Sequence, residues 1–258
     1  MDTNQNNISS TKIAGFGACM IGGYPHESGG LFEIACGLVE KTLSLPVQSR
    51  VSTLGGFSAP RAEKYLKLRI LSCNPDYVVI QFGSTDASCP IQSKHRLTEN
   101  SFQSGVSHAR NSPINRPSTV TIARWRLQSL VARFRKPDPV TSLSSYVAAI
   151  KHMVDDCILA QVTPIVLSPF IFGASYSTEN AIKYTNALRY VFSKMNQVIF
   201  IDCVQLLSKF PNSKVLLSDG FHLSRFGHNL IGEAIAQAVV ADIRAKIELS
   251  SRPVSAAQ

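Results

Sequence analysis

The sequence predicts an α/β protein: a single three-layer α/β/α domain built on a five-stranded, mostly parallel sheet. Short apolar runs rich in β-branched residues alternate along the chain with longer segments of helical periodicity. The chain has 258 residues and a hydrophobic content of 45%, which suits one well-buried core. Alternation of this kind implies parallel strands that are covered by helices on both faces.

Five segments are expected to be strands, and five are expected to be helical. The strand segments are IAGF from Ile13, VQSRVSTL from Val47, DYVVIQF from Asp76, TPIVLSP from Thr163 and VIFIDC from Val198. The helical patterns lie near residues 30–43, 59–72, 143–160, 178–195 and 223–247. In open parallel sheets the ligand site lies beyond the carboxyl ends of the strands, commonly between the first and third. The turns after Phe16 and Phe82 are therefore the expected place for a site.

We expect one domain over residues 1–250, with an insertion at 91–136 and a short C-terminal tail at 251–258. The first ten residues, MDTNQNNISS, contain neither a basic nor an apolar signal region, which predicts a cytoplasmic location. The uncharged run 157–178 is interrupted by prolines and polar residues, so we interpret it as helix end, strand and loop. No transmembrane segment is predicted.

The cysteines and glycines do not point to a metal or a cofactor. The six cysteines are Cys19, Cys36, Cys73, Cys89, Cys157 and Cys203. They lie mostly in apolar segments and form no CxxC pair, which favours buried free thiols over disulfides. The glycines match neither of the common nucleotide-binding patterns, and no His, Cys, Asp and Glu spacing suggests metal ligands.

The positive charge of the chain is concentrated in the insertion. Of the formal net charge of +9, residues 91–136 hold +8, from nine basic side chains and one acidic side chain. Apolar residues recur at helical spacing within 121–136, and arginines lie around them, which predicts a basic amphipathic helix. Its apolar positions are Ala123, Leu127, Leu130, Val131 and Phe134.

Two interpretations of this basic helix stay open. It can be a lid whose apolar stripe covers the mouth of a site and whose arginines are solvated. Alternatively, it binds an anionic membrane surface or an acidic polysaccharide. The arginines available for that contact are Arg124, Arg126, Arg133 and Arg135. Nucleic acid is a disfavoured partner, because aromatic residues that could stack on bases are scarce there.

Near the C-terminus, Asp219 and His222 lie three residues apart, just before an amphipathic helical pattern. At this spacing the carboxylate can orient the imidazole of the histidine. Such a pair needs only a nucleophile to form a catalytic triad. The alternative is structural, since Asp219 could be a helix N-cap and His222 a packing residue.

Four short blocks of the sequence resemble those of the SGNH (GDSL-type) hydrolase superfamily. They occur in the family's order, as GAC, GGFS, GSTD and DGFH, and span nearly the whole chain outside the insertion. The resemblance implies a flavodoxin-like fold and ester hydrolysis. It places Cys19 as the nucleophile and Asp219 with His222 as the rest of the triad. It assigns the oxyanion hole to Cys19, Gly56 and Thr85.

Three residues differ from the family pattern at chemically important positions. Ala18 replaces aspartate, Cys19 replaces the nucleophilic serine, and Thr85 replaces asparagine. A thiol beside a histidine is a sound nucleophile, because a thiolate–imidazolium pair can form. Threonine is a poorer oxyanion donor than asparagine, and losing one such donor costs about 100–1,000-fold in rate. Asp86, which closes the GSTD block, is expected to support the site by binding backbone N–H groups.

The leading hypothesis is an acyl-ester hydrolase of the esterase or deacetylase type with a Cys-His-Asp triad. Its substrate would be a small-molecule, lipid or glycan acyl ester. One alternative is an acyltransferase on the same fold, because a thioester intermediate can pass its acyl group to an acceptor other than water. The other is a catalytically inactive binding module, in which Cys19 is only a small apolar core residue.

Overall fold

The computed structural model describes residues 10–26, 29–88, 138–172 and 175–251, together with residues 123 and 127. Its five strands form one sheet in the order β2-β1-β3-β4-β5, and all neighbouring strands are parallel. The strands are β1 (Thr11–Gly17), β2 (Val47–Thr53), β3 (Tyr77–Gln81), β4 (Thr163–Leu167) and β5 (Ile199–Ile201). The predicted fold class is confirmed, and each predicted strand segment overlaps one of these strands.

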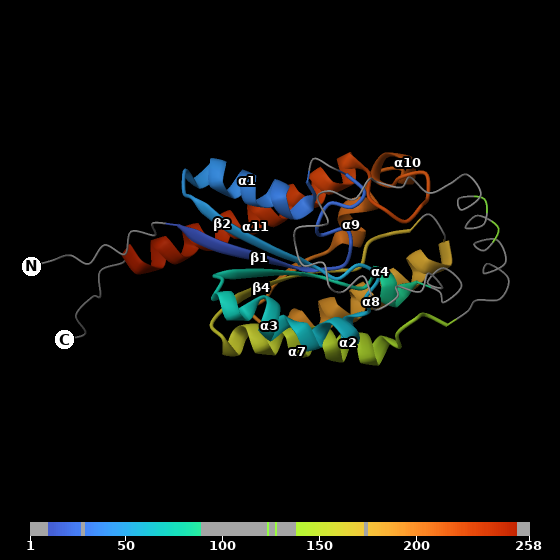
Figure 1. Ribbon diagram of the computed structural model, residues 1–258, viewed down its shortest axis with the longest axis horizontal. Coiled ribbons are helices and arrows are strands. Elements are labelled where there is room, and N and C mark those ends of the chain that lie inside the picture. Colours follow the sequence, from blue (N-terminus) through green and yellow to red (C-terminus); the bar gives the residue numbers. More distant parts are fainter. Residues whose placement is uncertain are drawn as a thin grey trace, which may run out of the picture.

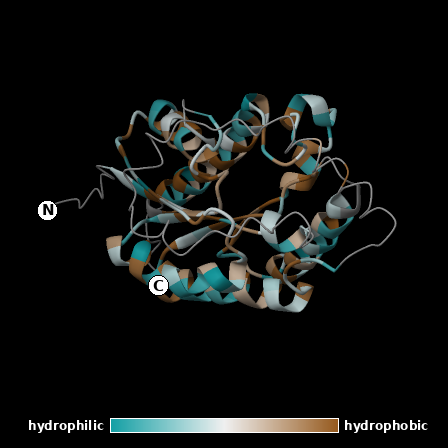
Figure 2. Ribbon diagram, turned by 45° about the vertical axis from the view of Figure 1, so that its right-hand side comes forward, coloured by the Kyte–Doolittle hydropathy of each residue, from teal (hydrophilic) through white to brown (hydrophobic). Residues whose placement is uncertain are grey.

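Helices cover both faces of the sheet (Figure 1). On one face lie α1 (Leu31–Leu43) and α11 (Arg225–Ser251), which pack against each other. On the other face lie α2 (Ala59–Ala62), α3 (Leu66–Arg69), α7 (Leu143–Leu159) and α8 (Ser175–Phe192). The short helices α4 (Ser84–Ala87), α9 (Cys203–Leu207) and α10 (Asn212–Val215) lie in loops that follow strands. Hydrophobic residues gather on the strands and on the helix surfaces that face them (Figure 2).

Two hydrophobic clusters, one on each side of the sheet, make up the core. In β1, Ile13 belongs to the cluster that includes α1 and α11, whereas Ala14 and Phe16 belong to the cluster that includes α7. This division follows from strand geometry, because successive side chains point to opposite faces. The central strand β3 is buried at every position, as expected for a strand covered on both faces.

Helix α7 shows how directly the sequence specifies an element here. Its buried residues recur at steps of three and four, and they are Tyr146, Ala149, Ile150, Met153, Val154 and Cys157. Ser142 caps its N-terminus, because its side chain accepts a hydrogen bond from the N–H of Ser145 at 3.2 Å. Periodicity and cap together explain why this helix matches its predicted range.

The helical pattern predicted near 59–72 is present, as four consecutive short helical turns rather than one regular α-helix. These are α2, the 3-10 turn Glu63–Tyr65, α3, and the 3-10 turn Leu71–Cys73. Most of the predicted insertion, 91–136, lies outside the described residues. Its two described residues, Ala123 and Leu127, are helical and exposed.

No helix in the described part of the chain is both long enough and apolar enough to span a membrane.

At the carboxyl edge of the sheet, β1 and β3 are neighbours although they are not consecutive in sequence. The strand order therefore reverses between them, which is the position expected to form a site.

Candidate active site

Cys19 lies in the turn that follows β1. The backbone N–H of Ala18 donates to the carbonyl oxygen of Gln81 at 3.0 Å, so the chain leaves β1 close against the end of β3. Gly17 permits this approach, because a Cβ atom there would lie 2.6 Å from the same oxygen. The Cys19 side chain is half-buried, and it packs against the cluster on the α1 and α11 side.

Asp219 and His222 lie in the loop before α11. An isolated antiparallel bridge between Leu216 and Leu223 closes this loop. One carboxylate oxygen of Asp219, Oδ1, accepts the N–H groups of Phe221 at 2.8 Å and His222 at 3.0 Å. The other oxygen, Oδ2, lies 2.7 Å from Nδ1 of His222. The carboxylate therefore shapes the loop and orients the imidazole at the same time.

The fold brings Cys19 to this pair from the other end of the chain. Its Sγ atom lies 3.8 Å from Nε2 of His222, whose Nδ1 faces Asp219. Burial alone would lower the pKa of His222, but its contacts with Asp219 and Cys19 raise it to about 9. Burial likewise favours a raised pKa at Asp219, yet the hydrogen bonds and positive charge of His222 lower it. The geometry favours an ionised Asp219 beside a protonated His222 at neutral pH.

His222 lies between two aromatic rings. The ring centroids of Tyr24 and Phe221 are 4.8 Å and 5.1 Å from the imidazole centroid. Their ring planes make angles of 64° and 75° with the imidazole plane, so both contacts are of the edge-to-face type. Tyr24 is 43% exposed. Burial raises the pKa of its hydroxyl, and the neighbouring Cys19 and Asp219 raise it further in the same direction. An aromatic side chain therefore lies at the solvent edge of the candidate site, beside His222.

Hydrogen bonds join the segment after Cys19 to the loop that carries His222. His26 Nε2 lies 3.0 Å from the carbonyl oxygen of Leu223, to which it can donate. Arg225 donates from Nη1 to the carbonyl oxygen of Gly29 at 2.8 Å. Both contacts link residues that are almost 200 positions apart, so they hold the two halves of the site in register.

A second histidine, His228, supports the same junction from inside the core. It is fully buried, and its Nδ1 accepts the N–H of Leu31 at 3.1 Å, at the start of α1. Burial and, to a lesser extent, the neighbouring His26 and Arg225 lower the pKa of His228 to about 3. His228 is therefore neutral at physiological pH and acts as a hydrogen-bond acceptor.

The GGFS turn lies beside the thiol. A Cβ atom at Gly55 would be 3.9 Å from the Cβ atom of Cys19, and Gly56 has a φ of 71°, which favours glycine. Among the described residues, the N–H groups of Cys19 and Gly56 donate to no protein acceptor, and the Thr85 hydroxyl makes no hydrogen bond. Among the described residues, no hydrogen bond joins Thr85 to Cys19, His222 or Asp219.

Asp86 connects the GGFS and GSTD turns. Both of its carboxylate oxygens accept the N–H of Ala59, at 3.0 Å and 3.2 Å, at the start of α2. Burial raises its pKa to about 6, although hydrogen bonds from Ala59, Thr141 and the local backbone oppose this effect. Asp86 thus binds backbone N–H groups, as expected. One of them, the N–H of Ala59, follows the GGFS turn and not the GSTD turn that contains Asp86.

Within the described residues, no group of three or more His, Cys, Asp or Glu side chains could hold a metal ion.

Sequence reasoning missed the contacts made by Tyr24 and His26 and the bridge that closes the DGFH loop. The only signal for the first two is the Tyr-Pro-His sequence shortly after Cys19. The third depends on two leucines whose pairing becomes visible only in three dimensions.

Comparison with known proteins supports the fold. No protein-family model matches the chain, and no curated protein matches it significantly. Solved structures do match over nearly the full length. A lipase/acylhydrolase from Enterococcus faecalis is 17% identical, with 92% of this chain and 96% of that chain covered and a TM-score of 0.57.

The acetylxylan esterase Axe2 from Geobacillus stearothermophilus is 16% identical, with 92% and 95% of the two chains covered and a TM-score of 0.58. Catalytic mutants of Axe2 replace a serine, and an aspartate and a histidine that are three positions apart. A protein assigned to the lipolytic G-D-S-L family from Desulfitobacterium hafniense is 14% identical, with 89% and 99% covered and a TM-score of 0.54. The chain therefore has the fold of SGNH-type hydrolases, as the resemblance implied.

Proposed function

We propose that this protein is an acyl-ester hydrolase with Cys19 as its nucleophile, His222 as its acid and base, and Asp219 as the group that orients His222. The observation that carries this proposal is the continuous contact from Cys19 Sγ to His222 Nε2 at 3.8 Å and from His222 Nδ1 to Asp219 Oδ2 at 2.7 Å. Nucleophile, base and orienting carboxylate in this order form the minimum set for covalent acyl transfer.

In the first step, the Cys19 thiolate attacks the ester carbonyl carbon. A carbon–sulfur bond forms, and the carbonyl π electrons move to the oxygen. The N–H groups of Cys19 and Gly56 and the hydroxyl of Thr85 are proposed to stabilise this oxyanion, since none of them has a protein partner in the described residues. The carbon–oxygen bond then breaks, and His222 gives its proton to the departing alcohol. Cys19 is left as a thioester.

The raised pKa of His222 suits a sulfur nucleophile. The tetrahedral intermediate contains both a thiolate and an alkoxide as leaving groups, and the thiolate, being the weaker base, leaves more easily. Productive collapse therefore requires a proton for the alkoxide. A histidine with a pKa of about 9 holds that proton throughout the neutral range. Esters with good leaving groups, such as aryl esters, should depend less on this proton than alkyl esters do.

In the second step, water attacks the thioester while His222, now neutral, accepts a proton from it. The carbon–sulfur bond breaks, the carboxylic acid leaves, and the thiolate–imidazolium pair is restored. We propose short acyl esters of carbohydrates or lipids as substrates. The support for this is the similarity in fold to an acetylxylan esterase and to a lipase/acylhydrolase. Binding of an anionic surface or polysaccharide by the arginines of the insertion remains a prediction.

A second candidate function, acyl transfer, is favoured by the sulfur at position 19. A thioester intermediate can be intercepted by a sugar hydroxyl or another acceptor in place of water. The two functions share every step up to the thioester. They differ only in which molecule attacks it.

The test is intact mass spectrometry after incubation with p-nitrophenyl acetate, followed by peptide mapping. We expect one acetyl group on Cys19, which then disappears by hydrolysis. The Cys19→Ala variant should carry none, whereas the matched control Cys203→Ala should behave as wild type. An acetyl group that persists until a sugar alcohol is added supports transfer. If Cys19 is never acetylated, both functions are excluded, and the binding-module alternative stands.

A further inference from the structure

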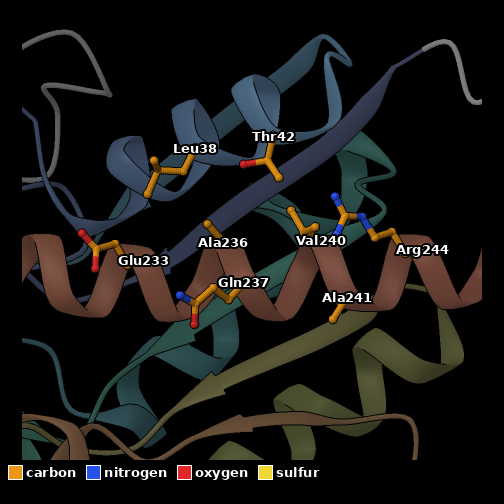
Figure 3. Close-up of a pocket in the computed structure, with 8 residues that line it drawn as sticks. All are labelled: Leu38, Thr42, Glu233, Ala236, Gln237, Val240, Ala241 and Arg244. Carbon is orange, nitrogen blue, oxygen red and sulfur yellow. The ribbon is translucent and has the colours of Figure 1, made fainter.

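A hollow of about 480 Å³ lies between α1 and α11, away from the residues of the candidate active site (Figure 3). Leu38 and Thr42 reach toward it from α1. The remaining lining residues all belong to α11, and they are Glu233, Ala236, Gln237, Val240, Ala241 and Arg244. The floor is mainly apolar, because Ala236 is 4% exposed and Val240 is 8% exposed.

The lining residues of α11 form one stripe along the helix, since they recur at steps of three and four. Glu233 lies at one end of the stripe and Arg244 at the other, eleven residues away. Both side chains are exposed, and neither makes an ion pair within the described part of the chain. The stripe therefore carries opposite charges at its two ends and small or uncharged residues between them.

This arrangement is complementary to a reversed copy of itself. If a second α11 runs antiparallel along the first, with the two-fold axis near Ala238 and Val239, Glu233 of each copy faces Arg244 of the other. The same operation places Gln237 opposite Val240. A contact in which residue i meets j and j meets i is what a two-fold dimer requires. Parallel pairing would instead place glutamate against glutamate and arginine against arginine.

We propose that two copies of this chain form a dimer through antiparallel α11 helices. The exposed ridge of each α11 occupies the groove between α1 and α11 of the other copy, as in ridges-into-grooves packing. This covers the apolar floor and the side chain of Leu38 on both copies. It also places Ile247, which is 48% exposed, opposite Leu230 of the second copy.

The charges set the orientation of the dimer more than its strength. Exposed ion pairs contribute little affinity and are screened by salt. The contact is limited to about five turns of one helix and the adjoining edge of α1, so a weak dimer is expected. Its dissociation should be promoted by salt, which distinguishes it from a purely apolar association.

Sedimentation equilibrium of the full chain over a range of protein and salt concentrations tests this proposal. Glu233→Arg and Arg244→Glu should each raise the dimer dissociation constant about tenfold or more, because like charges then meet at both ends. An equimolar mixture of these two variants should dimerise again, since every contact in the mixed dimer pairs opposite charges. The double variant should also recover, to within about threefold of wild type.

Lys183→Glu, on α8 at the opposite face of the sheet, is the matched control and should leave the dissociation constant unchanged. Thermal melts check that every variant is folded. A wild-type chain that stays monomeric at all concentrations contradicts the proposal. So does a dimer that both single reversals leave intact, or a mixture that fails to re-associate. These outcomes are independent of esterase activity.

Discussion

Cys19 and Cys203 both follow the carboxyl end of a parallel strand, β1 and β5 respectively, but their surroundings differ. Cys203 is fully buried at the first position of α9, and burial raises the pKa of its thiol. Cys19 is half-buried, and its sulfur faces Nε2 of His222. A helix N-terminus ordinarily favours a thiolate, yet at Cys203 the cost of burying the charge is larger.

The difference teaches that a strand-end position does not by itself make a cysteine reactive. Cys36 and Cys157 are also buried, and burial raises the pKa of each to about 12. Of the cysteines described, Cys19 is the one that combines partial exposure with a histidine partner. The tertiary contact, rather than the local sequence, separates the proposed nucleophile from the structural thiols.

The largest expected effect sharpens this comparison directly. Cys19→Ala should lower kcat/KM for p-nitrophenyl acetate by at least about 1,000-fold with little change in stability. Cys203→Ala should leave kcat/KM unchanged and lower the free energy of unfolding by about 1–2 kcal/mol, because it opens a small cavity. Steady-state kinetics and urea unfolding measure both. Equal activity in the two variants would contradict the assignment of Cys19.

The second effect concerns the titration of His222. Its folded pKa of about 9 lies above the unfolded value of 6.5, so its contribution to stability is complete below pH 6.5 and is lost as the pH rises through 9. The free energy of unfolding should fall by about 3 kcal/mol at most over that interval. Urea unfolding at a series of pH values measures this slope. In His222→Gln the same slope should be absent, and its persistence there would refute the explanation.

A smaller effect is expected at His26, which we interpret as a positioning residue for His222. His26→Ala should slow the alkylation of Cys19 by iodoacetamide about tenfold and move its pH profile, because the imidazole is no longer held against the sulfur. His26→Gln, which retains an N–H donor, should restore much of the rate. The matched control is His152→Ala, which removes an exposed histidine bonded to Glu63. Equal effects of both alanine variants would leave His26 without a positioning role.

The smallest effect is expected at Asp86, which supports the turn beside Cys19. Its folded pKa of about 6 lies above the unfolded value of 3.8, so burying its charge costs stability as the pH rises from 3.8 to 6. Asp86→Asn keeps an acceptor for the Ala59 N–H and removes the charge. At pH 7 the variant should be as stable as wild type or up to about 2 kcal/mol more stable. Thermal melts of the variant and of wild type at pH 4 and pH 7 measure the difference in stability. A variant that is less stable than wild type at pH 7 would contradict this account.

Much of the fold could be predicted because its signals are local. The periodicity of α7 and the β-branched run of β3 each depend on neighbouring residues, and both elements lie where they were expected. The helical pattern near 59–72 is also present, but as four consecutive short helical turns whose boundaries the periodicity did not indicate.

By itself, the sequence determined the fold class, the order of the elements and the Asp219–His222 pair, since all three depend on periodicity or short spacing. The resemblance of the four blocks predicted that Cys19 and His222 belong to one site, but only the tertiary structure gives their contact across 203 positions and shows that Tyr24 and His26 adjoin the same loop. It also decided that Glu233 and Arg244 border one groove. Contacts between distant residues depend on how the sheet is ordered and how the helices pack, and no local pattern encodes them.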